Sequence, residues 1–518
     1  MSGFRREASD ILDELDALRS ADAPTHGGRV LSYVYDSGLS ALDELAAEAA
    51  RRVQPVNGLD PTTFVSVAAM ERSVVGFACR VLGGGAGDGG GSADVVVGSV
   101  TSGGTESCLL AVKSARDAWR TARLGSPRVP RLVAPVTVHA AFHKAAHYFG
   151  LELDLVPVDP ATGTLAPAAI EERLGDDVAL VVLSAPSYPF ATLDPVADVA
   201  AITAERGIAL HVDACIGGFA LAFWPEPLPA WDLSVPGVTS LSADLHKYGY
   251  APKGASVLLT RGRDRQRHQY FATTGWPGYP VVNPTMTGSK PAGPLAAAWA
   301  IIEALGEPGF TELTAQAARA TAALRATIDE IEGLRVVGSA TGPLLAVATD
   351  EEVPEGSRVD PHHWADAARS AGWQLQLQPG LAQSDGTRLP HTTHLTVTPV
   401  TERVLPELAA ALVVAADEVR GIPQIDGGAA LAGLVEALPG FGSEGGPSGL
   451  DALAGADGGL DSDTAAAILG AAGLLGGEGA LPDRLAPVLA LVEALPGPLT
   501  ERLLVELLAR VVEPPAVG

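Results

Sequence analysis

A lysine that directly follows a histidine is the first chemical signal in the sequence, inside the stretch SADLHKYGYAPKG from Ser242 to Gly254. The amine of Lys247 can form an imine with a carbonyl group, which an arginine cannot do. Imine formation needs a partly neutral amine, so we expect burial and neighbouring cations to lower the pKa of Lys247. The adjacent His246 can contact an anion such as a phosphate.

Lysine is rare in this chain, which makes each one that remains informative. Only five of the 35 basic residues are lysines, and the others are arginines. A lysine kept against this bias favours a role that needs an amine. The five are Lys113, Lys144, Lys247, Lys253 and Lys290.

The glycine-rich stretch TSGGTES, Thr101 to Ser107, follows a predicted strand and opens a predicted helix. Gly104 lets the backbone approach an anion, and Thr105 can cap the helix. The free N–H groups of a first helical turn bind phosphate well. Many such turns serve geometry alone, and the spacing matches neither a P-loop nor a dinucleotide fingerprint.

Asp213 lies in the stretch HVDACIGG, at the predicted carboxyl end of a strand. Ligands gather at this edge of open α/β sheets. A carboxylate there can keep a pyridine nitrogen protonated, because opposite charges stabilise each other in a site of low dielectric constant. The other interpretation, a helix cap, is equally compatible with this stretch alone.

These groups must be positioned by a fold in which strands and helices alternate. Short Val, Ile and Leu runs alternate with helical patterns from about residue 93, which predicts a mostly parallel sheet covered on both faces. The expected fold class is α/β, with a large sheet domain, a smaller α+β domain and a helical tail. The expected ranges are 1–92 for an N-terminal helical segment, 93–334 for the large domain, 335–425 for the small domain and 426–518 for the tail.

Two segments stand apart from this alternation. The run GGGAGDGGGS at 83–92 predicts a flexible connector. In the tail, the heptapeptide LVEALPG occurs at 434–440 and again at 491–497, which predicts two helical hairpins. We favour a cap over apolar surface of the main body, and a surface for docking a partner is the alternative.

Composition limits the partners. The net charge of −26 argues against nucleic acid and anionic membranes, which both need a basic face. Three scattered cysteines do not suggest disulfides or a metal site. No apolar run is long enough to span a membrane, and no signal peptide opens the chain. We therefore expect a cytoplasmic protein without a bound metal.

Five segments together resemble the sphingosine-1-phosphate lyases, within the wider superfamily of pyridoxal 5'-phosphate (PLP)-dependent decarboxylases of fold type I. The resemblance runs from about Gly28 to Gly421 and does not cover the tail. It implies PLP as the cofactor and a homodimer with shared active sites. The segments are TSGGTES, APVTVHAAFHKAAHYFG, HVDACIGGF, SADLHKYGYAPKG and PTMTGSKPAG.

The resemblance also assigns roles to residues of the cofactor site. Lys247 matches the lysine that forms the Schiff base, and Asp213 the partner of the pyridine nitrogen. His139 matches the imidazole that stacks on the ring, and Cys215 packs on the opposite face. Phosphate contacts are implied for Gly104, Thr105 and His246, and from the neighbouring subunit for Gly288 and Ser289. The lyases carry arginine where this chain has Lys290.

The substrate side departs from the lyases. Their Asn-Pro-Leu-His-Pro stretch here reads Asn57-Gly58-Leu59-Asp60-Pro61, so a carboxylate replaces the histidine. Such a carboxylate would repel a phosphorylated substrate. The alternative is that Asp60 caps the helix that starts at Pro61. Three other positions match substrate-site residues of the family: Tyr35, Tyr188 and Lys253.

The function expected from the resemblance is carbon–carbon bond cleavage in an amine-bearing substrate or amino acid. Retro-aldol cleavage needs a base for the β-hydroxyl, and Tyr188 or a phosphate oxygen of the cofactor can serve. L-amino-acid decarboxylation is the main alternative. A transaminase would show an arginine clamp for a second carboxylate, which we do not identify. A scaffold without activity is disfavoured by Lys247, Asp213 and His139.

Overall fold

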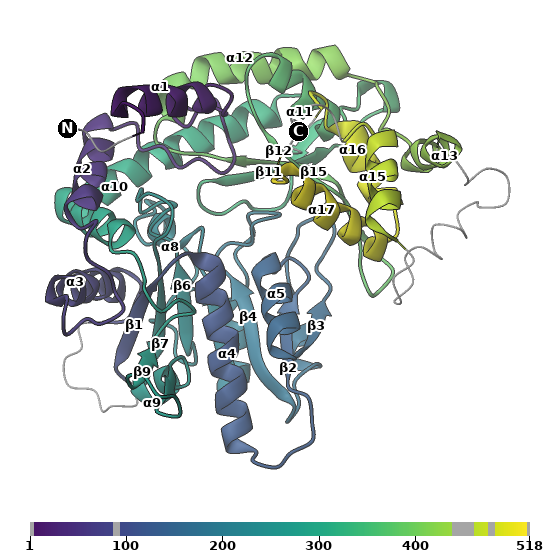
Figure 1. Ribbon diagram of the computed structural model, residues 1–518. Coiled ribbons are helices and arrows are strands. Elements are labelled where there is room, and N and C mark those ends of the chain that lie inside the picture. Colours follow the sequence, from purple (N-terminus) through teal and green to yellow (C-terminus); the bar gives the residue numbers. More distant parts are fainter. Residues whose placement is uncertain (1–4, 86–93, 438–459, 475–481, 515–518) are drawn as a thin grey trace.

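The computed structural model describes residues 5–85, 94–437, 460–474 and 482–514 (Figure 1). Most of the predicted glycine-rich connector, residues 86–92, lies outside the described residues. So does the end of the first heptapeptide copy, residues 438–440. Among the described residues, no helix is both long enough and apolar enough to cross a membrane.

A seven-stranded sheet forms the core of the larger unit, in the order β1-β7-β6-β5-β4-β2-β3. Strands β6, β5, β4, β2 and β3 pair in parallel, and β7 pairs antiparallel to both β1 and β6. The prediction of a mostly parallel sheet is therefore confirmed. The strands are β1 (Val96–Thr101), β2 (Arg131–Pro135), β3 (Glu152–Val156), β4 (Val178–Ser184), β5 (Ala209–Asp213), β6 (Ser240–Ala243) and β7 (Ser256–Arg261).

Helices cover this sheet, and its central strands are almost entirely buried. All seven residues of β4 are buried, as expected for a strand covered on both faces. The helices that follow its strands along the chain are α4 (Gly104–Ala122), α5 (Ala140–Phe149), α6 (Pro167–Glu171), α7 (Val196–Glu205), α8 (Gly218–Leu221) and α9 (Arg263–Arg267).

The carboxyl ends of these strands meet at one edge of the sheet, which brings the predicted chemical groups together. Asp213 is the last residue of β5, and Asp244 directly follows β6. Helix α4 begins at Gly104, three residues after β1 ends. Segments that are more than 100 residues apart in the chain therefore converge on the edge where open α/β sheets bind ligands.

The smaller unit holds a four-stranded antiparallel sheet in the order β10-β11-β15-β12. Its strands are β10 (Leu334–Val336), β11 (Leu344–Thr349), β12 (Gln376–Gln378) and β15 (Thr392–Thr396). Helices α11 (Pro361–Ser370) and α12 (Thr401–Val419) accompany it, and the short 3-10 helix η1 (Glu355–Ser357) precedes α11. Two short hairpins complete the described strands: β8 (Phe271–Thr273) with β9 (Val281–Asn283), and β13 (Leu381–Ala382) with β14 (Arg388–Leu389).

The N-terminal segment runs along the smaller unit before the chain enters the large sheet. Helix α1 (Ala8–Arg19) is followed by a stretch in which the Leu31 N–H donates to the Gln374 carbonyl at 2.8 Å, and the Thr396 N–H donates to the Leu31 carbonyl at 2.8 Å. Helices α2 (Ser40–Arg52) and α3 (Val65–Val81) then pack against the long helix α10 (Gly293–Asp329). The segment after Leu31 carries Tyr33 and Tyr35 toward the large sheet.

Helix α10 joins the two units and is interrupted once. Gly306 has φ +54° and ψ −176°, and Pro308 follows two residues later. A left-handed φ suits glycine, and a proline inside a helix removes a hydrogen bond and kinks the axis. Up to Leu313 the helix packs into the core of the large unit, and from Ala320 onward into that of the smaller unit.

Four helices form the described part of the C-terminal extension: α13 (Gly427–Ala437), α15 (Ser462–Ala471), α16 (Ala486–Ala494) and α17 (Gly497–Val511). They share an apolar core that includes Leu434, Ile468 and Leu499. The second heptapeptide copy ends α16 and turns directly into α17. Asp366 of α11 caps α16, because its carboxylate accepts the N–H groups of Leu485 and Ala486, each at 2.9 Å.

We predict that Asp366→Ala loosens the extension from the main body. Asp366 is buried, so its loss leaves two N–H groups without an acceptor and costs about 2 kcal/mol of stability. Limited proteolysis and thermal melting measure this effect, and cleavage within 482–514 is expected first. Asp264→Ala is the control, since the Asp264 side chain is 80% exposed. Equal protease resistance of both variants would contradict the capping role.

Candidate active site

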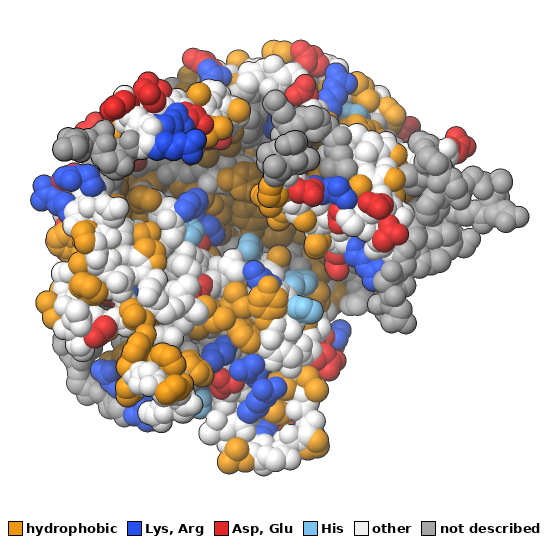
Figure 2. Space-filling model, viewed as in Figure 1, with side chains coloured by type: hydrophobic (Ala, Val, Ile, Leu, Met, Phe, Trp, Pro, Cys, Tyr) orange, Lys and Arg blue, Asp and Glu red, His pale blue; other side chains and the backbone are white. Residues whose placement is uncertain are grey.

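A cavity of about 750 Å³ opens at the carboxyl edge of the large sheet, between the two units. Figure 2 shows the molecule hollowed at this place. Nine of the residues predicted from the sequence line it: Tyr35, Gly104, Thr105, His139, Tyr188, Asp213, Cys215, His246 and Lys247. The fold therefore gathers most of the predicted site in one space.

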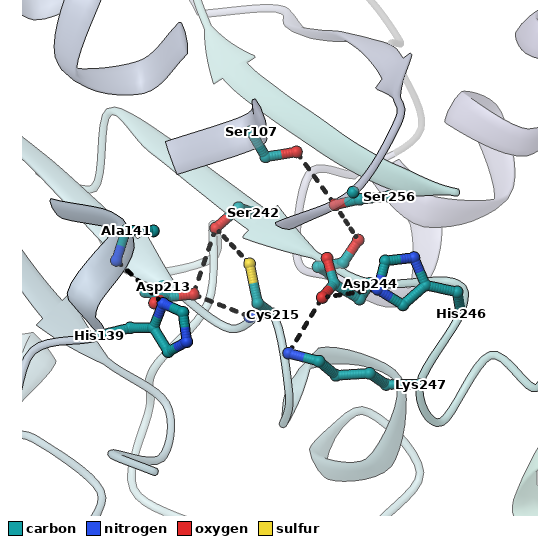
Figure 3. A network of polar contacts seen from close by, with 12 residues as sticks. Ser107, His139, Ala141, Asp213, Cys215, Ser242, Asp244, His246, Lys247 and Ser256 are labelled. Atoms are coloured by element: carbon teal, nitrogen blue, oxygen red, sulfur yellow. Dashed lines mark hydrogen bonds and ion pairs between the residues drawn. The ribbon is translucent and has the colours of Figure 1, made fainter. Parts of the chain in front are cut away.

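Lys247 lies in the turn that follows β6, and its amine points toward Asp244 (Figure 3). The Nζ atom is 3.0 Å from Asp244 Oδ2. Burial is the largest single effect and lowers the pKa of Lys247, but the Asp244 carboxylate together with Tyr35 and Cys215 outweighs burial and raises the pKa above its usual value. The expected lowered pKa is therefore wrong for this form, because the sequence analysis did not include an anion three residues away.

Asp244 is the functional residue that the sequence analysis missed. Its carboxylate is almost fully buried and is also 3.3 Å from His246 Nε2. Burial raises the pKa of Asp244, yet Lys247 and His246 reverse this effect and hold the pKa well below its usual range. Its position three residues before the lysine was the available signal, because a turn after a strand brings such side chains together.

Asp213 is held in one orientation by its neighbours. Its Oδ1 accepts the Cys215 N–H at 3.0 Å and the Ser242 hydroxyl at 3.4 Å (Figure 3). The Cys215 thiol in turn donates to Ser242 Oγ at 3.2 Å. This network keeps a carboxylate at the cavity wall, where it can pair with a positively charged nitrogen.

His139 precedes α5 and caps its N-terminus. Its Nδ1 accepts the Ala141 N–H at 3.2 Å, which assigns the ring proton to Nε2 in the neutral form. The ring is exposed on its other side and lines the cavity. It is therefore free to lie against a planar ligand.

The turn into α4 forms a close-fitting cradle. Gly103 has φ +156° and ψ 168°, a conformation that essentially only glycine adopts. A Cβ atom on Gly104 would lie 2.7 Å from Asp244 Oδ2 and 2.9 Å from Cys215 Sγ, so no larger residue fits. The first-turn N–H groups of α4 lie beside the cavity, which suits an anion.

Three buried groups at the wall of the cavity have the spacing of metal ligands. The ligand atoms of Cys108, Asp213 and Cys215 all lie within 4.8 Å of one another. Burial raises the pKa of the Cys108 thiol, and the hydrogen bond with Cys108 together with burial raises that of Cys215. Protonated thiols are poor metal ligands. The absence of a metal stays a prediction.

Two tyrosines form the substrate side of the cavity. Tyr35 packs edge-on against Tyr248, and Tyr188 stacks on His394 with ring centroids 4.1 Å apart. Burial raises the pKa of Tyr188, so its hydroxyl keeps its proton. This direction favours Tyr188 as a hydrogen-bond donor and disfavours the predicted role as a base.

Lys253 lies beside the cavity and does not line it. Its Nζ donates to the His246 carbonyl at 3.2 Å and lies 4.6 Å from the centre of the Tyr35 ring. Partial burial and the nearby Lys247 ammonium lower the pKa of Lys253 to about 8. Lys253 therefore supports the Tyr35 ring from outside.

Four predicted residues lie away from the cavity of their own chain. Asp60 is exposed, and its carboxylate accepts the Thr62 N–H and hydroxyl and the Thr63 hydroxyl, which stabilise the turn at 61–64. Helix α3 starts only at Val65, so the predicted cap of a helix at Pro61 is wrong. Hydrogen bonds from Thr62 and Thr63 lower the pKa of Asp60 to about 2. The other three are Asn57, Gly288 and Ser289.

The segment from Gly288 to Lys290 is divided between surface and interior. Gly288 and Ser289 are exposed. Lys290 is buried, donates to the Val100 carbonyl at 2.8 Å and pairs with Glu71 at 3.4 Å. Lys290 is therefore engaged inside its own chain, unlike the two residues before it.

Comparisons with known proteins agree with this arrangement. The family model "Pyridoxal-dependent decarboxylase conserved domain" matches residues 40–345, and "Pyridoxal-dependent enzyme, C-terminal putative HTH domain" matches residues 447–510. The sphingosine-1-phosphate lyase of Dictyostelium discoideum is 34% identical over 68% of this chain and 64% of its own length. The rice enzyme of the same name is 34% identical over 76% of this chain and 69% of its own length.

Solved structures extend this comparison to the fold. The sphingosine-1-phosphate lyase of Burkholderia pseudomallei has a TM-score of 0.73 and 31% identity, over 81% of this chain and 93% of that chain. A Lactobacillus brevis glutamate decarboxylase, with a TM-score of 0.69 and 18% identity over 82% of this chain and 96% of its own, shares the fold. This chain is thus a sphingosine-1-phosphate lyase-like member of the pyridoxal-dependent decarboxylase family, with the type I fold and PLP as its cofactor.

Proposed function

We propose that this protein is a PLP-dependent carbon–carbon lyase that cleaves the Cα–Cβ bond of an amine-bearing substrate in a retro-aldol reaction. The observation that carries the proposal is that the Lys247 amine and the Asp213 carboxylate line the same cavity, in a chain 31% identical to a solved sphingosine-1-phosphate lyase over 93% of that chain. L-amino-acid decarboxylation uses the same lysine and carboxylate and is the alternative.

The residues of the cavity fit the cofactor. Lys247 offers the amine for its aldehyde carbon, and Asp213 offers the carboxylate for its ring nitrogen. The cradle at Gly104, which a Cβ atom would fill, offers N–H groups for its phosphate. When bound, PLP supplies an electron sink that stabilises negative charge at the substrate's Cα.

The chain's own groups control protons around this centre. Asp244 holds a proton on Lys247 Nζ, so this proton must leave before the amine can attack a carbonyl carbon. The Cys215 N–H and the Ser242 hydroxyl orient Asp213, which then keeps its bound partner protonated. Tyr188 retains its hydroxyl proton and can donate a hydrogen bond to a substrate oxygen.

The position of Asp60 bears on the choice of substrate. The sequence suggested that this carboxylate repels a phosphorylated substrate, but within one protomer it lies outside the cavity lining and binds its own Thr62 and Thr63. The reason for preferring an unphosphorylated substrate therefore weakens. This supports a phosphorylated amino alcohol, the substrate class named for the relatives, as the first substrate to test.

We further propose a homodimer in which each site takes groups from both chains. Gly288 and Ser289 are exposed at the end of a segment with several exposed large apolar side chains. A cluster of this kind on a protein surface marks an association site. These side chains are Phe271, Trp276, Tyr279, Val282 and Met286.

We also propose that the protein is located in the cytoplasm.

Replacement of Lys247 tests the reaction centre. Lys247→Ala is expected to abolish turnover and the absorbance near ~420 nm that a lysine-bound PLP gives. Wild-type enzyme incubated with phosphorylated sphingoid bases and with amino acids should release a fatty aldehyde and no carbon dioxide. The control is Lys113→Ala, because Lys113 donates to the His268 carbonyl outside the cavity lining. Release of carbon dioxide from an amino acid would favour the decarboxylase, and retained absorbance in Lys247→Ala would refute the lysine assignment.

Asp213→Asn is expected to leave the cofactor bound and to lower kcat by about two orders of magnitude or more, because a neutral amide no longer keeps the ring nitrogen protonated. Absorbance titration with PLP and steady-state kinetics separate the two effects. Near-normal kcat would show that the electron sink does not depend on this carboxylate.

Shared sites predict complementation between two inactive variants. Lys247→Ala destroys the centre in its own chain, and Ser289→Trp blocks the site of the neighbouring chain. Mixed dimers of the two should regain about a quarter to a half of wild-type activity, because one site per dimer receives both intact contributions. Native mass spectrometry verifies mixing, and size-exclusion chromatography shows the dimer. A monomer in solution, or inactive mixed dimers, would contradict the shared site.

A further inference from the structure

The C-terminal extension contacts the main body at a hairpin that borders the cavity. Glu493, near the end of α16, accepts the Gly380 N–H at 3.0 Å with one carboxylate oxygen. Its other oxygen pairs with Arg388 at 2.6 Å. The Glu493 side chain is 10% exposed, whereas that of Arg388 is 53% exposed. The extension therefore places a largely buried carboxylate at the base of the β13–β14 hairpin.

This hairpin forms one wall of the cavity. Within 379–390, four residues line the cavity, and all four are apolar: Pro379, Leu381, Leu389 and Pro390; the polar Gln378 and Thr392 line it on either side. Its tip is fixed to the large unit, because Gln383 exchanges two hydrogen bonds with the backbone of Val158, at 2.9 and 2.8 Å. The hairpin is thus held at its tip by the large unit and at its base by the extension.

Helix α16 is itself anchored firmly enough to act as a support. Asp366 caps its N-terminus, and Ala486 belongs to the apolar core of the smaller unit. Beyond α16, Glu501 of α17 is close enough to His143 of α5 to raise its pKa, against the larger lowering effects of burial and His139. Figure 1 shows α16 and α17 on the same side of the molecule as α5. The extension therefore contacts the hairpin at the cavity wall, and α17 lies near α5, whose N-cap residue His139 lines the cavity.

The negative charge of the extension argues against a role in binding nucleic acid. Residues 426–518 hold 13 acidic residues against three arginines and no lysine. Binding to nucleic acid requires a basic surface that contacts phosphates. A helix-turn-helix arrangement with this charge is unsuited to reading DNA.

We propose that the extension helps to determine the shape of the substrate cavity. Glu493 is a positioning residue: it fixes the segment 379–390 and thereby sets the width of the apolar end of the cavity. The extension in this way selects among substrates by the size of their apolar portion. The substrate in this inference is the one given by the proposed function. The placement of the hairpin by Glu493 does not depend on that function.

The first test measures the hairpin directly in the PLP-loaded enzyme. In Glu493→Ala, amide hydrogen exchange in 380–389 is expected to be about tenfold faster than in wild type, because a buried charged acceptor is lost. Glu493→Gln keeps an acceptor for the Gly380 N–H and should show a smaller change. Glu436→Ala is the control, since Glu436 is an exposed carboxylate on α13 of the same extension. Unchanged exchange in Glu493→Ala would overturn the proposal.

The second test uses kinetics with two probes, a phosphorylated long-chain sphingoid base and a short-chain phosphorylated amino alcohol. Glu493→Ala should raise KM for the long-chain probe about fivefold and change kcat less than twofold, with little effect on the short-chain probe. Equal changes for both probes, or a loss in kcat alone, would overturn the role in selection. If neither probe is turned over by wild type, the proposed function fails, while the exchange experiment still decides whether Glu493 fixes the hairpin.

Discussion

The buried ion pair between Lys247 and Asp244 is the interaction on which the site depends. Two charges removed from water are stable only when paired at short range, and the 3.0 Å contact meets this condition. The pair also limits the residues around it. Gly104 must be glycine because Asp244 occupies the space of a Cβ atom, so the anion cradle and the reactive amine are fixed by the same carboxylate.

Sequence reasoning was successful where function depends on local order along the chain. Asp213 is the last residue of a strand, and Gly104 and Lys247 follow within four residues of a strand's end, so the sheet delivers all three to one edge. It failed for contacts that depend on distant partners or on side-chain orientation. The Asp244 carboxylate was overlooked. The predicted direction of the pKa shift of Lys247 was therefore wrong. The alternative role of Asp60 as the cap of a helix at Pro61 was also wrong, because α3 starts at Val65 and the Asp60 carboxylate binds Thr62 in the turn before it.

The contacts of the extension lay beyond the reach of sequence patterns. Glu493 meets Gly380 and Arg388 across more than 100 residues, and neither composition nor periodicity specifies such a pair. The repeated heptapeptide did predict the helix end at the second copy. The preferred interpretation of the tail as a cap over the main body agrees with Ala486 in the core of the smaller unit.

The path of the N-terminal segment has a consequence for how the protein is made. Leu31 bonds to Gln374 and Thr396, so the segment that carries Tyr35 into the cavity cannot find its place until more than 340 further residues have left the ribosome. During synthesis this early segment therefore lacks its final hydrogen-bond partners. Completion of the cavity is therefore a late, non-local event, and a chain that stops short of Thr396 lacks the strand that holds the first-made residues in place.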